Sequence, residues 1–292
     1  MSVRLFVSRL GINRSMLVRI LTRMEQPTLR ALRARAVGAG AVAAAALRWL
    51  EAGTVTVPVG HGQGLKFDLR HLRLDHAHLG SIATGWLETS VQEAMVRHLG
   101  AGDVLYDIGA NLGFFSLLGA RLAGPQGHVY ALEPAPENAV AIRRHAELND
   151  VVNLSVLEQA AAAESGRGRL QLVDDRSWSK LEGYGEHPGT ERVVGVELVA
   201  IDELLGSGQL RPPTLVKIDV EGAELAVLEG MAATLERHRP AVICELHDTH
   251  APFTAFMTER GYRVVNLEGP EPVEQDPRSE HALALPALDP GD

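Results

Sequence analysis

The residues best suited to chemistry lie in four short segments, each of which follows an apolar run. The first segment, residues 107–113, reads D-I-G-A-N-L-G. Glycines at this spacing let the backbone turn tightly and approach a ligand closely. The leading Asp107 differs from the G-x-G-x-x-G turn that admits a pyrophosphate, because a carboxylate repels phosphate and attracts an ammonium group. The segment therefore favours a ligand with an amino-acid end over a nicotinamide dinucleotide.

The second segment is the pair Glu133-Pro134, which ends the next apolar run. A carboxylate at this point has two oxygens that can accept hydrogen bonds from both hydroxyls of a ribose. An ammonium-binding turn followed about 20 residues later by a ribose-binding acid matches the two ends of S-adenosylmethionine. The two segments together predict that cofactor.

The third segment, residues 217–224, reads K-I-D-V-E-G-A-E. Residues two apart on a strand share a face, so Lys217 and Asp219 should point the same way. Lys217 has apolar neighbours and is expected to need a carboxylate partner. Asp219 and Glu221 should lie at the carboxyl edge of a sheet, whereas Glu224, one turn into a helix, is expected to be a solvated or capping group.

The fourth segment, Glu245-Leu246-His247, ends another apolar run. Transfer of a methyl group to a hydroxyl requires removal of the hydroxyl proton, and histidine suits a general base because its ordinary pKa is near 6.5. We therefore expect His247 or Asp219 to act as the base, with Glu221 and Glu245 orienting the acceptor or the imidazole. A divalent metal site formed by the same four residues is the less favoured alternative, and no metal ligand is assigned.

Apolar strands that alternate with amphipathic helices predict an α/β fold, a doubly wound and mostly parallel sheet covered on both faces. Ligands of such sheets bind at the carboxyl ends of the strands, near the switch in strand order. The predicted strands are residues 104–108, 128–132, 153–157, 214–219, 241–246 and 262–267. The predicted helices are residues 86–99, 113–122, 135–149, 201–205, 223–238 (broken near Gly230) and 252–260. Further expectations are a hairpin at 54–74, a charged strand surface at 70–78, a strand pair at 168–173 and 193–199, and an edge strand at 281–285.

Four ordered motifs resemble the FkbM family of methyltransferases: DIGANLGFFSL, YALEPAPENAVAIRRHAELN, VKIDVEGAELAVLEGM and ICELH. The resemblance runs from about Trp86 to Leu267. It implies a class I methyltransferase (Rossmann-like) fold, S-adenosyl-L-methionine as cofactor, and transfer of a methyl group to a hydroxyl of a sugar, glycan or secondary metabolite. It also implies a set of cofactor-binding residues: Asp107, Gly109, Asn111 and Gly113 for the methionine end, Glu133 for the ribose, and Asn138, Gln159 and Ala160 near the adenine.

Composition supports a globular enzyme and limits its partners. The 292 residues are 46% hydrophobic and 22% charged, and a single cysteine, Cys244, excludes an intrachain disulfide framework. The net charge of −9 argues against nucleic-acid binding. Residues 1–50 hold nine arginines and one acid, yet their uncharged stretch is too short to span a bilayer. We expect a cytoplasmic protein, with peripheral membrane contact through residues 1–50 as an alternative.

The expected organisation is a basic helical N-terminal extension (1–53), an FkbM-like methyltransferase domain (54–268) and a Pro-rich acidic tail (269–292). The polar segment 174–184, which contains Trp178, could cover a substrate. The partner of the enzyme is expected to be a small-molecule or glycan hydroxyl acceptor. Two other functions stay open: an N-methyltransferase acting on a protein or small-molecule amine, and a catalytically inert membrane-peripheral binding protein.

Overall fold

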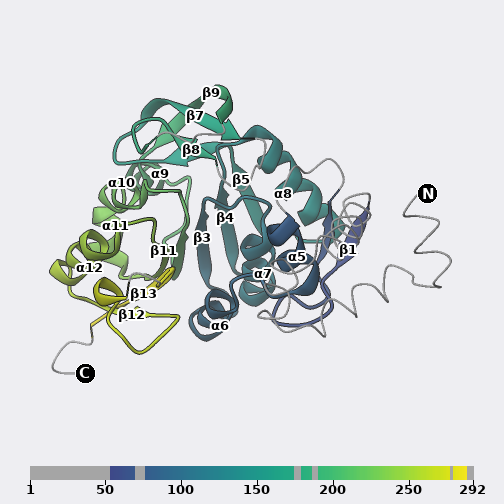
Figure 1. Ribbon diagram of the computed structural model, residues 1–292, viewed down its shortest axis with the longest axis horizontal. Helices are drawn as coiled ribbons and strands as arrows, with labels where there is room; N and C mark the ends of the chain where they lie inside the picture. The colour runs from purple at the N-terminus through teal and green to yellow at the C-terminus, as the bar shows by residue number, and fades with distance from the viewer. Residues whose placement is uncertain (1–52, 70–75, 174–178, 186–189, 277–278, 288–292) are drawn as a thin grey trace, which may run out of the picture. The chain divides into compact units, whose positions relative to one another are not determined.

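The computed structural model describes residues 53–69, 76–173, 179–185, 190–276 and 279–287 (Figure 1). The predictions for residues 1–52, 70–75 and Trp178 therefore lie outside the described residues. The chain divides into two compact units, residues 1–89 and 90–292, which are described separately below. No helix among the described residues is both long enough and apolar enough to cross a bilayer.

The first unit contains the predicted hairpin. Its strands β1 (Thr54–Thr56) and β2 (Lys66–Asp68) pair antiparallel. The helix α5 (His76–Thr84) follows. The prediction that residues 70–78 form a charged strand is therefore wrong for the part that is described, because His76 begins a helix. Over so short a stretch, the alternation of polar and apolar residues does not distinguish the two-residue period of a strand from the 3.6-residue period of a helix.

The second unit is built on a seven-stranded sheet of order β12-β13-β11-β10-β3-β4-β5. Six of the seven strands run in the same direction, and β13 runs antiparallel to its two neighbours, β11 and β12. The bounds are β3 Val104–Ile108, β4 His128–Leu132, β5 Leu154–Leu157, β10 Leu215–Ile218, β11 Ala241–Glu245, β12 Tyr262–Asn266 and β13 His281–Pro286. The predicted edge strand is thus an internal strand, β13, inserted between β11 and β12.

Helices cover both faces of this sheet (Figure 1). On one face lie α6 (Thr89–His98), α7 (Phe114–Ala123) and α8 (Pro136–Leu148). On the other lie α9 (Ile201–Gly206), α10 (Glu224–Glu229), α11 (Ala232–His238) and α12 (His250–Glu259). Alternate residues of β3 divide between them: Tyr106 belongs to the core under α9–α12, whereas Leu105 faces Gly119 of α7. The doubly wound prediction is confirmed.

The break between α10 and α11 lies at Gly230, where the backbone packs closely against the backbone of Ala162. A Cβ atom on Gly230 would lie 2.0 Å from the carbonyl oxygen of Ala162. Only glycine lets the chain pass there without displacing the neighbouring backbone. The predicted break near Gly230 is therefore confirmed and has a packing cause.

A smaller sheet of order β6-β9-β7-β8 interrupts the alternation after β5. Its strands are β6 Gln159–Ala161, β7 Gly166–Val173, β8 Lys180–Leu181 and β9 Thr190–Val199. The predicted pairing of β7 with β9 is antiparallel, with a register shift after Leu172. This sheet contributes Gln159, Leu170 and Leu181 to the site described next.

Candidate active site

The site lies where the strand order reverses. From β3 the chain adds β4 and β5 on one side, and then returns to add β10 and β11 on the other. At the carboxyl ends of β3 and β10 the two following turns touch: a Cβ atom on Gly109 would lie 1.8 Å from the carbonyl oxygen of Asp219. Gly109 has φ +80°, so both its conformation and its surroundings require glycine. Crevices at such reversals are the usual ligand sites of doubly wound sheets.

A pocket opens at this crevice, with about 600 Å³ of empty space that includes space open to solvent. Eight of the residues predicted for the site line it: Gly109, Asn111, Glu133, Asn138, Gln159, Ala160, Asp219 and Glu221. The remaining wall comes from Ile108, Leu132, Pro134, Ala161, Leu170, Ser179, Leu181 and Val220. The structure therefore brings six of the eight predicted cofactor residues and two predicted catalytic carboxylates to one pocket.

Two predicted cofactor residues lie behind the wall of the pocket instead. Asp107 is 1% exposed, and its carboxylate accepts a hydrogen bond from the Ser116 hydroxyl. Gly113 has φ +79°, and a Cβ atom there would press against Ile142 of α8 at 3.0 Å. Both residues shape the turn between β3 and α7. Their predicted contact with the methionine end stays a prediction.

Glu133 is a buried carboxylate at the end of β4 that binds the neighbouring turn. Its Oε2 accepts a hydrogen bond from the Asn111 backbone at 2.8 Å, and its Oε1 accepts one from the Ala135 backbone at 2.9 Å. Asn138 approaches Oε1 at 3.5 Å. Burial raises the pKa of Glu133 to about 7 although these hydrogen bonds oppose the shift. A polar ligand that donates hydrogen bonds to this carboxylate would favour its ionised form.

The donor and acceptor groups of the pocket fit S-adenosylmethionine. The Oδ1 atom of Asn111 and the hydroxyl of Ser179 are buried and have no hydrogen-bond partner within the described residues. Leu170 and Leu181 add apolar surface near Gln159 and Ala160. An ammonium group, ribose hydroxyls and a flat adenine ring would find partners of these types. Sequence reasoning missed Leu170 and Leu181, because a short strand pair carries no sign of the pocket that it faces.

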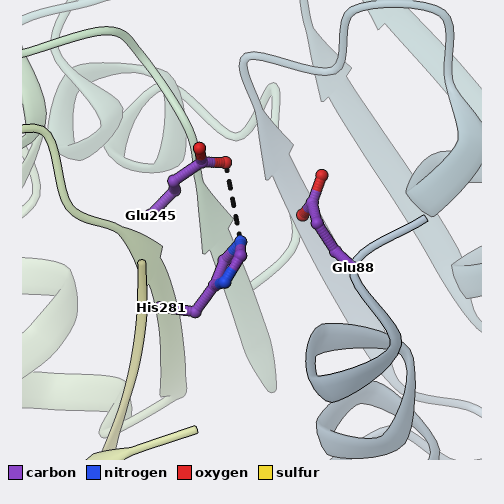
Figure 2. A group of neighbouring side chains, drawn as sticks. All are labelled: Glu88, Glu245 and His281. Atoms are coloured by element: carbon purple, nitrogen blue, oxygen red, sulfur yellow. Dashed lines mark ion pairs between the residues drawn. The ribbon is translucent and has the colours of Figure 1, made fainter. Parts of the chain in front are cut away.

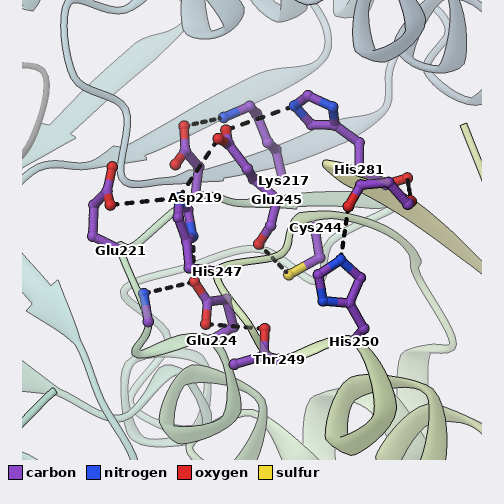
Figure 3. Close-up of polar contacts among 12 residues, drawn as sticks. Lys217, Asp219, Glu221, Glu224, Cys244, Glu245, His247, Thr249, His250 and His281 are labelled. Carbon is purple, nitrogen blue, oxygen red and sulfur yellow. Dashed lines mark hydrogen bonds and ion pairs between the residues drawn. The ribbon is translucent and has the colours of Figure 1, made fainter. Parts of the chain in front are cut away.

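His247 lies among three carboxylates next to the pocket (Figure 3). Its Nδ1 is 2.7 Å from Oε1 of Glu224. Its Nε2 is 3.5 Å from Oε2 of Glu221 and 3.5 Å from Oε1 of Glu245. The structure thus groups His247 with two of the carboxylates that were predicted to act with it, and adds Glu224.

This arrangement argues against His247 as the general base. Burial opposes protonation of His247, but hydrogen bonds to Glu224 and Glu245 and the charge of Glu221 outweigh it and raise the pKa of His247 to about 11. A base must be free to accept a proton at the working pH, and this imidazole already carries one near neutrality. Burial raises the pKa of Glu221, although the His247 charge opposes that shift.

Glu224 differs from its predicted role as a solvated or capping group. It is 0% exposed. Besides His247, its Oε1 accepts a hydrogen bond from the Gly222 backbone at 2.8 Å, and its Oε2 accepts one from the Thr249 hydroxyl at 3.3 Å. Neither contact caps α10. Glu224 therefore joins the turn after β10 to the segment after β11. An acid at the first turn of a predicted helix indicates a cap, but the sequence does not show that a histidine from another strand reaches it.

Lys217 has the carboxylate partner that the sequence predicts. It is 2% exposed, its Nζ lies 3.0 Å from Oδ2 of Asp219, and it sits 4.7 Å from the centre of the Phe115 ring. A buried ammonium group needs such a partner because isolated charges are costly to desolvate. The pair fixes Asp219 at the edge of the pocket.

Two further residues of this network come from the C-terminal part of the chain. His281, on β13, has its Nε2 3.6 Å from Oε2 of Glu245 (Figure 2). Its Nδ1 is 2.8 Å from Oε1 of Glu268. Burial would raise the pKa of Glu245, but its polar and charge interactions with His247 and His281 outweigh burial and hold that pKa well below its ordinary value. Sequence reasoning missed both residues because they lie in the predicted tail or at its border.

The same cluster contains the groups of the alternative metal site. Asp219, Glu221 and His247 each offer one ligand atom, and these atoms lie within 4.8 Å of one another. Oxygen and imidazole ligands suit several divalent ions. However, the proton that the three carboxylates hold on His247 would compete with a metal ion at Nε2.

Comparison with known proteins identifies the family of this chain. The family model described as "Methyltransferase FkbM domain" matches residues 107–264. The hexuronic acid methyltransferase AglP of Haloferax volcanii is 30% identical over 161 residues, which are 55% of this chain and 62% of AglP. The 31-O-demethyl-FK506 methyltransferase FkbM of Streptomyces tacrolimicus is 27% identical over 235 residues, with 69% of this chain and 87% of that protein covered.

The solved structures that match this chain include methyltransferase FkbM from Methylobacillus flagellatus (17% identity, TM-score 0.44, 73% of this chain and 56% of that chain covered). An S-adenosylmethionine-dependent O-methyltransferase from Thermotoga maritima is 12% identical, with a TM-score of 0.43 and coverage of 71% and 68%. The family model spans the turn after β3, the acid after β4, the segment after β10 and most of the strands between which the pocket lies. The chain belongs to the FkbM methyltransferase family and is an S-adenosylmethionine-dependent methyltransferase of the class I fold.

Proposed function

We propose that the protein transfers a methyl group to a hydroxyl of a sugar, glycan or secondary metabolite. The observation that carries this proposal is the position of Asp219 and Glu221, two carboxylates that share a pocket wall with Gly109, Asn111 and Glu133. A hydroxyl acceptor must be held and deprotonated beside the cofactor, and carboxylates can do both.

S-adenosylmethionine, when bound, supplies an electrophilic methyl group on a positively charged sulfur. On the protein side, Glu133 would accept hydrogen bonds from the ribose hydroxyls, and the unpartnered Oδ1 of Asn111 would accept one from the ammonium end. Negative charge at Asp219 and Glu221 suits a cationic cofactor at the same crevice. The pocket residues thereby fix the position at which the acceptor must arrive.

Glu221 is the proton acceptor in this proposal. It lines the pocket, burial raises its pKa, and a carboxylate with a raised pKa is a stronger base than an ordinary one. His247 lies 3.5 Å away and, as a cation, orients Glu221 and compensates its charge. Asp219 is held by Lys217 at 3.0 Å and would orient the acceptor hydroxyl.

The names of two relatives support a hydroxyl acceptor. AglP is named for a hexuronic acid, which is a sugar derivative, and FkbM of Streptomyces tacrolimicus is named for the 31-O position of its substrate. Both names describe small or glycan-like acceptors. The proposal extends that class of acceptor to this protein, and the individual acceptor is what the next experiment identifies.

Incubation of the protein with methyl-labelled S-adenosylmethionine and an extract of its host should transfer label to a sugar, glycan or metabolite. We expect the label to be on oxygen, and hence an ether, when the product is analysed by mass spectrometry. Label on nitrogen would support the alternative of amine methylation, and no transfer by folded protein would support an inert binding protein. The same assay in the presence of a chelator should give unchanged transfer, whereas loss of transfer would support the alternative metal site.

A further inference from the structure

We propose that His281 and Glu268, which lie beyond the residues matched by the family model, position the proton acceptor of the active site. The inference rests on the proposed function for its catalytic consequence. Its structural basis is a row of alternating acids and histidines that runs from the segment after β12, through β13 and β11, to the pocket. Figures 2 and 3 show the part of this row from His281 to Glu221.

The row begins with a tightly held Glu268–His281 pair. Oε1 of Glu268 is 2.8 Å from His281 Nδ1, and Oε2 accepts a hydrogen bond from the His281 backbone at 3.0 Å. The Ser90 hydroxyl donates to Oε1 at 2.9 Å. His281 is 3% exposed, so its ring orientation is fixed by these contacts and by the surrounding core. Nδ1 is thereby committed to Glu268, and Nε2 is directed to the next acid.

The row continues to the pocket in three steps. His281 Nε2 is 3.6 Å from Glu245 Oε2, and the other oxygen of Glu245 is 3.5 Å from His247 Nε2. His247 Nε2 is also 3.5 Å from Glu221 Oε2, and Glu221 lines the pocket. The pairing of β11 with β13 sets Glu245 directly opposite His281, so the sheet register itself fixes this step.

The charged groups that face Glu245 from residues 90–292 are His247, His281 and Lys217, with Asp219, Glu221 and Glu224 around them. A histidine between two acids is favoured in its charged form. His281 therefore attracts and orients Glu245, Glu245 in turn holds the charged His247, and His247 orients Glu221. Removal of His281 should weaken this alignment without removing any wall of the pocket.

The test compares His281→Asn with the wild type in two measurements. The first follows the carboxyl carbon of Glu245 by NMR during an acid titration, in protein labelled at glutamate. Loss of His281 should raise the midpoint of Glu245 by about one pH unit, because a neighbouring cation is lost. The second measures methyl transfer, for which we expect a loss of kcat at unchanged KM for S-adenosylmethionine.

His250→Asn is the matched control. His250 is also a histidine whose ring is held by one hydrogen bond, from Nε2 to the Ser279 carbonyl at 2.8 Å, but its ring is not placed between two acids. It should change neither the Glu245 midpoint nor kcat. Glu268→Gln provides a second variant should His281→Asn fold poorly, and it should act in the same direction. The double variant should lose no more kcat than His281→Asn alone, because Glu268 acts through His281.

An unchanged Glu245 midpoint or an unchanged kcat in folded His281→Asn protein would overturn the inference. So would a loss of kcat matched by an equal loss in His250→Asn, because that result would indicate a general packing effect. The NMR measurement needs no acceptor. If the wild type transfers no methyl group while His281→Asn still shifts the Glu245 midpoint, the proposed function fails and the link between His281 and Glu245 is retained.

Discussion

Glu221→Gln is expected to lower kcat for methyl transfer by about 10²- to 10⁴-fold, the usual range for loss of a general base. The substitution keeps the size of the side chain and its left-handed backbone (φ +52°), so the pocket should retain its shape. The amide cannot accept the acceptor's proton and carries no charge to pair with His247. Affinity for S-adenosylhomocysteine should change little, because the cofactor is assigned to Glu133 and the turn after β3.

Single-turnover kinetics with the identified acceptor, together with calorimetry of S-adenosylhomocysteine, would measure both parts of this prediction. Glu236→Gln, an exposed position on α11, is the matched control for loss of one carboxylate charge and should leave both values unchanged. A Glu221→Gln variant with wild-type kcat would contradict the assignment of Glu221 as proton acceptor. Asp219 would then be the remaining pocket carboxylate for that role.

Gly109→Ala should destabilise the fold by about 2–5 kcal/mol, the sum of a left-handed backbone penalty and of overpacking. The added Cβ atom would lie 1.8 Å from the carbonyl oxygen of Asp219, so the turns after β3 and β10 would have to separate. This separation would also move Asp219 and Glu221 away from the cofactor turn. We therefore expect loss of S-adenosylhomocysteine binding in the variant as well.

Urea unfolding would compare Gly109→Ala with Gly102→Ala. Gly102 also has a positive φ, +91°, but no atom lies within 4 Å of the Cβ position. Gly102→Ala should lower the free energy of unfolding only by the penalty for a left-handed backbone, about 1–2 kcal/mol. Equal destabilisation in the two variants would contradict the claim that the contact between the two turns requires glycine.

The parts of the fold that the sequence predicts are those set by local patterns. β3 and β4 occupy the predicted residues because each is a continuous apolar run followed by a turn-forming residue. The pocket position follows from the same patterns, because the carboxyl ends of parallel strands must meet at one edge. Glu133, Asp219 and Glu221 were predicted for this reason, and all three line one pocket.

The parts that the sequence does not predict depend on contacts between distant segments. The strand β13 was identified from its apolar residues, but its place between β11 and β12 depends on where the chain returns, which local spacing does not encode. His281 enters the site network through that placement. His247 was identified by residue type, yet its pKa is set by Glu221 and Glu224 from the segment after β10 and by Glu245 from the end of its own strand.

The central claim is that the pocket between the ends of β3, β4 and β10 holds the cofactor through Glu133. Calorimetric titration of the full chain with S-adenosylhomocysteine tests it most directly. The wild type should bind one molecule per chain, and Glu133→Ala should bind at least about 10-fold more weakly, as expected for loss of hydrogen bonds to a charged group. Glu137→Ala, which removes a carboxylate paired with Arg192 outside the pocket, should bind like the wild type. Absence of binding by folded wild-type protein, or wild-type affinity in Glu133→Ala, would contradict the claim.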